Sequence, residues 1–136
     1  METLITGRIG SDDEERNRRL VLDFYENVIG KRQYDRWPDY LHPDYIQHKP
    51  NIGDGPQGVI DFMRDNYARY PRHTPEIIRS FVDGDYVFLH VHVHMEPHNR
   101  DIAVMDIFRC ADGRLVEHWD VEQPVPTEMK HENGMF

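Results

Sequence analysis

The spacing of apolar residues changes once along the chain, and this change constrains the fold more than any other feature of the sequence. As far as Tyr70, apolar residues recur at intervals of three and four, which is typical of amphipathic helices. From Glu76 onward they alternate with polar residues, which is typical of strands with one buried face. Helices followed by a run of strands predict an α+β domain, with the helices packed on one face of an antiparallel sheet.

Three helices are expected in the first half. The first follows a capping box at residues 11–14 and continues to Gly30. The second is short and spans residues 34–41. The third spans residues 59–70 and ends before Pro71, because proline cannot continue a helix beyond its first turn.

Four strands are expected in the second half, at residues 77–82, 86–95, 102–110 and 114–122. The dipeptide Asp112-Gly113 predicts a tight turn between the last two strands, since both residue types accept the backbone that such turns need. The last two strands are therefore expected to form a hairpin.

The chain is expected to form one domain, residues 1–136, in which residues 1–11 are a flexible N-terminal segment.

Composition limits the class of partner. With 16 Lys and Arg against 25 Asp and Glu, its net charge of −9 repels phosphate backbones, so we expect no nucleic-acid partner. No apolar run approaches a membrane span, so no membrane partner is expected either. Cys110 is the only cysteine, which excludes an internal disulfide and favours a cytoplasmic location.

Three segments carry a family resemblance: DYIQHKP at residues 44–50, AVMDIFR at residues 103–109 and DGRLVEHWDV at residues 112–121. Together they resemble the SnoaL-like proteins, a family of the nuclear-transport-factor-two-like superfamily. The resemblance extends over residues 12–136 and includes the ending NGMF at residues 133–136.

The resemblance implies a cone-shaped α+β fold, in which three N-terminal helices pack on the concave face of a curved antiparallel sheet. It also implies a homodimer and no cofactor. The superfamily includes polyketide cyclases that perform intramolecular aldol condensations, ketosteroid isomerases, dehydratases, epoxide hydrolases and binding proteins that catalyse nothing. The expected fold therefore does not by itself predict the function.

Site residues follow from the same resemblance. The order of elements is similar to that of ketosteroid isomerase. By this similarity, Tyr25 matches the tyrosine that donates a hydrogen bond to the substrate oxyanion, and Asp106 matches the aspartic acid beside it. His48 stands where the isomerase has its aspartate base, and a neutral imidazole is also a competent base. Asp120 lies close to the position of an aspartate in epoxide-hydrolase relatives, although the arginine that accompanies it there is missing.

The residues themselves support part of this assignment. Asp106 shares a strand face with Val104 and Phe108, and a carboxyl group there must be hydrogen-bonded or protonated. One possibility is that Asp106 donates a hydrogen bond to an enolate or acts as a general acid. The other is that it is a structural partner of an arginine or a histidine. His118 and Asp120 share one face of the next strand, and the predicted hairpin brings His118 within reach of Asp106, as a catalytic relay or a structural ion pair.

The strand at residues 86–95 alternates between two side-chain types. Leu89, Val91 and Val93 are expected to face the core, and His90, His92 and His94 the outside of the sheet. Three imidazoles on one face are also a candidate metal site, but residues two apart on a strand lie roughly 7 Å apart, so one ion can seldom use all three. If the alternation is reversed, His90 reaches the rim of a pocket.

Candidate pocket walls are the aromatic and apolar residues Tyr25, Trp37, Tyr45, Phe62, Met63 and Phe108. The leading hypothesis is a cofactor-free enzyme that abstracts a proton next to the carbonyl of a small apolar compound. His48 is its base, alone or together with Asp120. Asp106 and Tyr25 stabilise the enolate. His118 orients a catalytic group or relays a proton. The alternatives are a non-catalytic, homodimeric small-molecule binder and a metal-dependent enzyme that uses the histidine strand.

Overall fold

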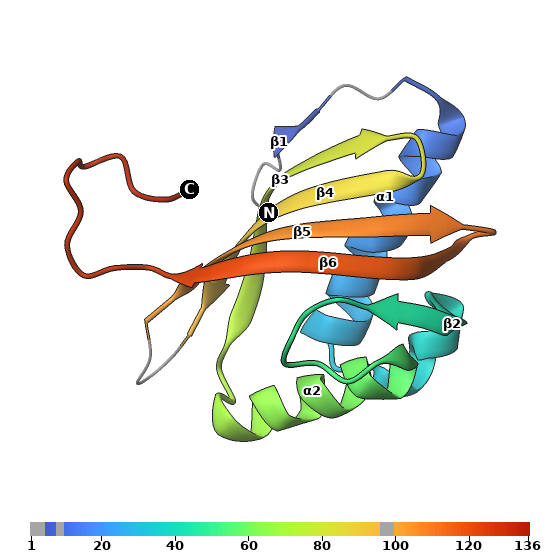
Figure 1. Cartoon of the computed structure of the whole chain (residues 1–136), viewed down its shortest axis with the longest axis horizontal. Helices are drawn as coiled ribbons and strands as arrows, with labels where there is room; N and C mark the ends of the chain where they lie inside the picture. The colour runs from blue at the N-terminus through green and yellow to red at the C-terminus, as the bar shows by residue number, and fades with distance from the viewer. Residues whose placement is uncertain (1–4, 8–9, 96–99) are drawn as a thin grey trace.

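The computed structural model describes residues 5–7, 10–95 and 100–136 and has the α+β architecture expected from the sequence (Figure 1). Its helical segments are α1 (Asp12–Phe24), the π-helical η1 (Tyr25–Gly30), the 3₁₀ helix η2 (Tyr34–Asp39) and α2 (Gly55–Arg69). Its strands are β1 (Ile5–Thr6), β2 (Leu41–Gln47), β3 (Thr74–Asp83), β4 (Tyr86–His94), β5 (Ile102–Ala111) and β6 (Arg114–Pro124). Among the described residues, no helix has the length and apolar character needed to cross a membrane.

The six strands form one curved sheet in the order β1-β3-β4-β5-β6-β2. The four central strands pair antiparallel, and the two edge strands pair parallel to their neighbours. The predicted hairpin between β5 and β6 is confirmed, with Asp112 and Gly113 both at positive φ. Helix α1 lies behind the sheet in Figure 1 and covers its inner face.

Helix α1 begins and ends for identifiable reasons. The Ser11 side chain accepts a hydrogen bond from the Glu14 backbone N–H at 3.2 Å, as the capping box predicts. Four acidic residues in the first turn complement the positive end of the helix dipole. After Phe24 the helix continues as η1, and π-helical turns of this kind are frequent at functional sites.

The first half of the chain differs from expectation in three ways. Residues 34–41 hold only a six-residue 3₁₀ helix, and Leu41 already belongs to β2. Strand β2 was not expected, because its burial pattern does not alternate regularly and its register with β6 shifts between Leu41 and Ile46. Of the expected flexible segment, residues 1–4 and 8–9 lie outside the described residues, whereas β1 pairs with β3.

The three-helix arrangement on the concave face is therefore met only in part. Helix α1 contacts β3, β4 and β6, whereas η2 contacts η1 and the edge strand β2, and α2 makes its main contacts with β2. This arrangement leaves a space between the sheet, α1 and α2 instead of closing it.

The alternation of β4 is as expected. Val87, Leu89 and Val91 are buried in the core with α1, so the histidines between them lie on the outer face of the sheet. Inward-facing side chains of β4 also line part of a pocket.

Candidate active site

A pocket of about 320 Å³ lies between the inner face of the sheet, η1, β2 and α2. Of the predicted wall residues, Tyr25, Tyr45, Phe62, Met63 and Phe108 line it. Trp37 and His90 do not: Trp37 packs against the core from η2, and His90 lies on the outer face. The volume falls at the lower end of the range for small-molecule sites.

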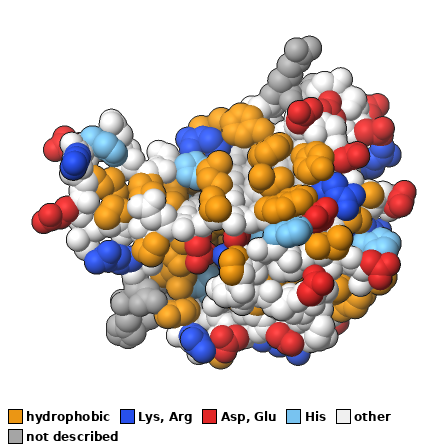
Figure 2. Space-filling view, viewed as in Figure 1, with side chains coloured by type: hydrophobic (Ala, Val, Ile, Leu, Met, Phe, Trp, Pro, Cys, Tyr) orange, Lys and Arg blue, Asp and Glu red, His pale blue; other side chains and the backbone are white. Residues whose placement is uncertain are grey.

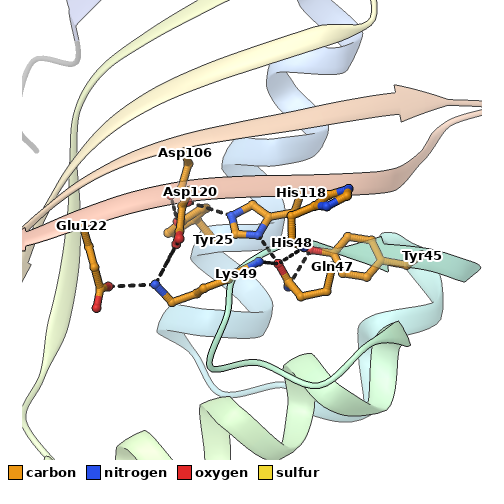
Figure 3. A network of polar contacts seen from close by, with 9 residues as sticks. All are labelled: Tyr25, Tyr45, Gln47, His48, Lys49, Asp106, His118, Asp120 and Glu122. Atoms are coloured by element: carbon orange, nitrogen blue, oxygen red, sulfur yellow. Dashed lines mark hydrogen bonds and ion pairs between the residues drawn. The ribbon is translucent and has the colours of Figure 1, made fainter.

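Asp106 lies at the inner end of this pocket and is only 2% exposed. Its Oδ2 accepts a hydrogen bond from the hydroxyl of Tyr25, and its Oδ1 lies 2.8 Å from Nε2 of His118 (Figure 3). The predicted contact between His118 and Asp106 is thus confirmed. Burial, followed by the negative charge of Asp106, raises the pKa of Tyr25 well above its usual value, so the phenol remains a hydrogen-bond donor.

Gln47 determines how His118 is protonated. Its Oε1 accepts hydrogen bonds from two backbone N–H groups, those of His48 at 3.1 Å and Lys49 at 2.9 Å. The same oxygen lies 2.7 Å from Nδ1 of His118, so Nδ1 must carry a proton and donate it. Nε2 of His118 faces Oδ1 of Asp106, so a hydrogen bond between them needs a proton on one of these two atoms.

Asp120 faces Asp106 directly across the β5–β6 ladder. Two carboxylates opposite each other are unfavourable unless their charges are compensated. Here Nζ of Lys49 lies 3.1 and 2.9 Å from the two oxygens of Asp120 and 2.8 Å from Oε2 of Glu122, with only 6% of the lysine side chain exposed. Figure 3 shows Lys49 extending under β6 to both carboxylates.

This environment shifts the pKa values of both partners. Burial raises the pKa of Asp120, the ammonium of Lys49 opposes that shift, and the nearby Asp106 adds to it, so the net direction is upward. For Lys49 burial lowers the pKa, but the contacts with Glu122 and Asp120 outweigh it, and its pKa is raised. Lys49 is therefore a fixed cation, and Asp120 is a stronger base than an exposed carboxylate.

His48 does not enter the pocket. Its ring stacks on Trp119 with 4.9 Å between centroids, and its Nε2 lies 2.8 Å from Oε2 of Glu117, both on the outer side of β6. The structure therefore does not bring His48 together with Asp106. The reason is the alternation of an extended segment: Gln47 and Lys49 point inward, so the residue between them points outward.

The SnoaL-like domain model matches residues 21–118, which is more than two thirds of the chain. The chain belongs to the SnoaL-like domain family. No curated protein sequence matches it.

Solved structures of similar fold agree with this family. A proposed polyketide cyclase from Bacillus cereus has a TM-score of 0.77 and 16% identity, with 89% of this chain and 85% of that chain covered. A proposed SnoaL-like polyketide cyclase from Jannaschia has a TM-score of 0.72 and 21% identity, with coverages of 85% and 91%. A proposed ketosteroid isomerase from Kribbella flavida has a TM-score of 0.69 and 17% identity, with coverages of 90% and 86%.

Sequence reasoning missed two polar residues of this SnoaL-like domain, Gln47 and Lys49. Both flank His48, which drew attention as a titratable residue in a turn-rich segment. The only available signal was the alternation itself: if β2 is extended up to residue 49, then Gln47 and Lys49 share a face opposite to His48. Nothing in the order of residues indicates that a lysine followed by a proline is buried.

The site also contains three residues of the types that bind metal ions. Single ligand atoms of Asp106, His118 and Asp120 lie within 4.8 Å of one another. Both nitrogens of His118 already have partners, however, and the ammonium of Lys49 occupies the cation position beside Asp120. The arrangement is suited to moving protons between fixed groups.

Proposed function

We propose that this SnoaL-like domain is a cofactor-independent acid–base enzyme that enolises a small apolar carbonyl compound, leading to an aldol-type cyclisation or an isomerisation. One observation carries the proposal: two carboxyl groups face each other inside the pocket, each with different partners. Asp120 contacts a cation, and Asp106 contacts the phenol of Tyr25 and an imidazole. Paired carboxyls in contrasting environments are how enzymes separate an acid from a base.

Asp120 is the proposed base. Its pKa is raised by burial, which strengthens it as a proton acceptor, while Lys49 stabilises the ionised form that must accept the proton. A carboxylate has about four lone-pair sites, so the contacts with Lys49 leave others directed at the pocket. This role replaces the one expected for His48, whose ring lies on the outer face.

Asp106 is the proposed acid. It shares one proton with His118 and is buried at the inner end of the pocket, where it can donate that proton toward the carbonyl oxygen of a bound substrate. Tyr25 donates to the other oxygen of Asp106 and limits the charge that develops there. His118 keeps its Nδ1–H bond to Gln47 throughout, and the enol oxygen returns the donated proton to Asp106 when the ketone forms again.

The pocket favours a compact substrate of low polarity. Many of its lining residues are aromatic or aliphatic, among them Phe24, Phe62, Val91, Val104 and Phe108. The structural relatives named as polyketide cyclases and a ketosteroid isomerase act, by those names, on carbonyl compounds, and this likeness supports the same substrate class here.

The test is proton exchange next to a carbonyl group. The full-length chain is incubated in D₂O with a panel of cyclic ketones, aryl ketones and 1,3-diketones, and deuterium incorporation at the α-carbon is followed by NMR. We expect exchange above the buffer rate for at least one member, and a loss of about 10²- to 10⁴-fold in Asp120→Asn, because the base is removed.

A matched control is Glu117→Gln, which makes the same carboxyl-to-amide change on the same strand but on the outer face. It should exchange the substrate at the wild-type rate. Ligand-dependent thermal stabilisation without exchange of any ketone would contradict the enzyme proposal and favour the non-catalytic binder. Equal exchange by wild type and Asp120→Asn would contradict the assignment of the base.

We also propose a homodimer formed through the outer face of the sheet. Met105 and Val121 oppose each other in the β5–β6 ladder and are 50% and 72% exposed. Figure 2 shows apolar side chains gathered over the strands on this face, where a second copy would bury them. Light scattering should give a dimer mass for the wild type and a monomer mass for Met105→Glu/Val121→Glu; a monomeric wild type contradicts this proposal.

A further inference from the structure

The outer face of the sheet carries a second group of imidazoles and carboxylates, remote from the pocket. Glu76 on β3 is the direct ladder partner of His92 on β4, so both side chains lie on the same face. His94 follows two residues later on that face. Asp101 precedes β5 and lies beside both histidines. Three neighbouring segments of the chain thus direct ligand-type side chains to one point.

The contacts within this cluster are short. Nε2 of His94 lies 2.9 Å from Oε1 of Glu76, and Nε2 of His92 lies 2.8 Å from Oδ2 of Asp101. One ligand atom each of Glu76, His92 and His94 lies within 4.8 Å of the other two. Ligand atoms around tetrahedral Zn²⁺, with bonds near 2.0–2.1 Å, are about 3.3 Å apart, so small side-chain rotations are enough to close the set around an ion.

The cluster is held in place by its surroundings. The ring of His92 is stacked between those of His94, at 3.8 Å between centroids, and Phe136, at 3.9 Å. Stacking occupies the faces of the ring and leaves its edge, which carries the nitrogens, directed at the carboxylates. Asp101 is oriented by a hydrogen bond from the Met95 backbone N–H to its Oδ1 at 2.9 Å.

We propose that Glu76, His92 and His94 form a binding site for a divalent first-row transition metal such as Zn²⁺, with Asp101 as a supporting hydrogen-bond partner of the histidines. Imidazole nitrogen together with carboxylate oxygen favours such ions, whereas Mg²⁺ and Ca²⁺ prefer sites made only of oxygen. The site is independent of the proposed enzyme chemistry, because it lies on the opposite face of the sheet.

His90 is excluded from the site although it lies on the same strand and the same face. Its Nδ1 lies 2.5 Å from Nη1 of Arg79, and a guanidinium beside an imidazole repels a metal ion. The chain therefore contains its own matched control: a histidine two residues from His92 that the geometry assigns to a different partner.

The test is a calorimetric titration of the full-length, untagged chain with ZnCl₂. We expect one equivalent to bind to the wild type, binding weakened by at least about 10- to 100-fold in His92→Ala/His94→Ala, and wild-type binding in His90→Ala. MgCl₂ should produce no binding heat. Circular dichroism establishes that each variant is folded.

Two results would overturn the proposal. One is the absence of Zn²⁺ binding to the folded wild type, which would make the cluster a set of ion pairs only. The other is equal affinity in wild type and the double variant, which would place the ion elsewhere. If the double variant does not fold, Glu76→Gln replaces it, since this change keeps the shape of the side chain, and undiminished affinity in Glu76→Gln also overturns the site.

Discussion

Two histidine–carboxylate clusters occupy opposite faces of one sheet, and they differ in their exposure to water. On the inner face, the side chains of Asp106 and His118 are 2% and 7% exposed. On the outer face, those of His94 and Glu76 are 42% and 29% exposed, although the pair is as close, at 2.9 Å. Two histidine–carboxylate pairs at nearly the same distance therefore differ in the dielectric around them, which decides how strongly each pair interacts.

Burial determines what each of the two clusters can do. Inside the pocket, both carboxyl oxygens of Asp106 and both ring nitrogens of His118 have a protein partner, so the pair is held in one hydrogen-bonding arrangement. On the outer face the histidines and their carboxylate partners are partly exposed, so a cation can reach them. The inner cluster is suited to acid–base catalysis and the outer one to reversible binding.

After the removal of the base in Asp120→Asn, the largest effect should come from changing Asp106 in the inner cluster. Asp106→Asn keeps the shape of the side chain but removes the acidic proton, so we expect α-proton exchange to fall by about 10²- to 10³-fold. The measurement is exchange of the best ketone of the panel, with circular dichroism as the folding control. A rate within a factor of two of wild type would show that Asp106 is structural.

Double-mutant cycles measure how strongly each histidine–carboxylate pair interacts. Urea unfolding of single and double alanine variants should give a coupling free energy of about 1.5–3 kcal/mol for Asp106–His118. The solvent-screened pair Glu76–His94 should give about 0.2–1 kcal/mol. Equal coupling on the two faces would contradict the role assigned to burial.

The pH dependence of exchange tests Lys49. Asp120 must be ionised to act, so activity is lost as the pH falls through its pKa, which burial raises. Lys49→Met removes the cation that holds this pKa down, and the acid limb of the profile should therefore move to higher pH. An acid limb that stays in place would show that Asp120 is not the titrating base.

The smallest effect is expected for His48→Ala. Its ring contacts Trp119 and Glu117 on the outer face, so the exchange rate should change by less than about twofold. A loss comparable to that of Asp106→Asn would mean that His48 enters the pocket when substrate binds, and would restore it as a candidate base.

Much of the architecture could be predicted from local patterns. The capping box at Ser11, the turn at Asp112-Gly113 and the alternation of β4 each correspond to the structure, because each depends on residues adjacent in the sequence. Tyr25 and Asp106 were also recognisable as site candidates, the latter because a carboxyl group in an apolar strand needs a partner.

The polar side of the site was less predictable. Lys49 and Gln47 reach the pocket only because β2 pairs in parallel with β6, with Gln47 in register with His118. That pairing joins segments about seventy residues apart and contains a register shift, so no local period announces it. Without it, His48 was the residue of that segment expected to act.

By itself, the order of residues determined helix α1, strands β3 to β6 and the inward or outward direction of side chains within each of these strands, since these features follow from short-range backbone geometry. Tertiary structure alone decided that, of three consecutive residues, Gln47 reaches His118 and Lys49 reaches Asp120, whereas His48 reaches neither. The physical reason is that register between distant strands is set by the burial of the whole sheet face, and a shift of one residue exchanges a lysine for a histidine at the site.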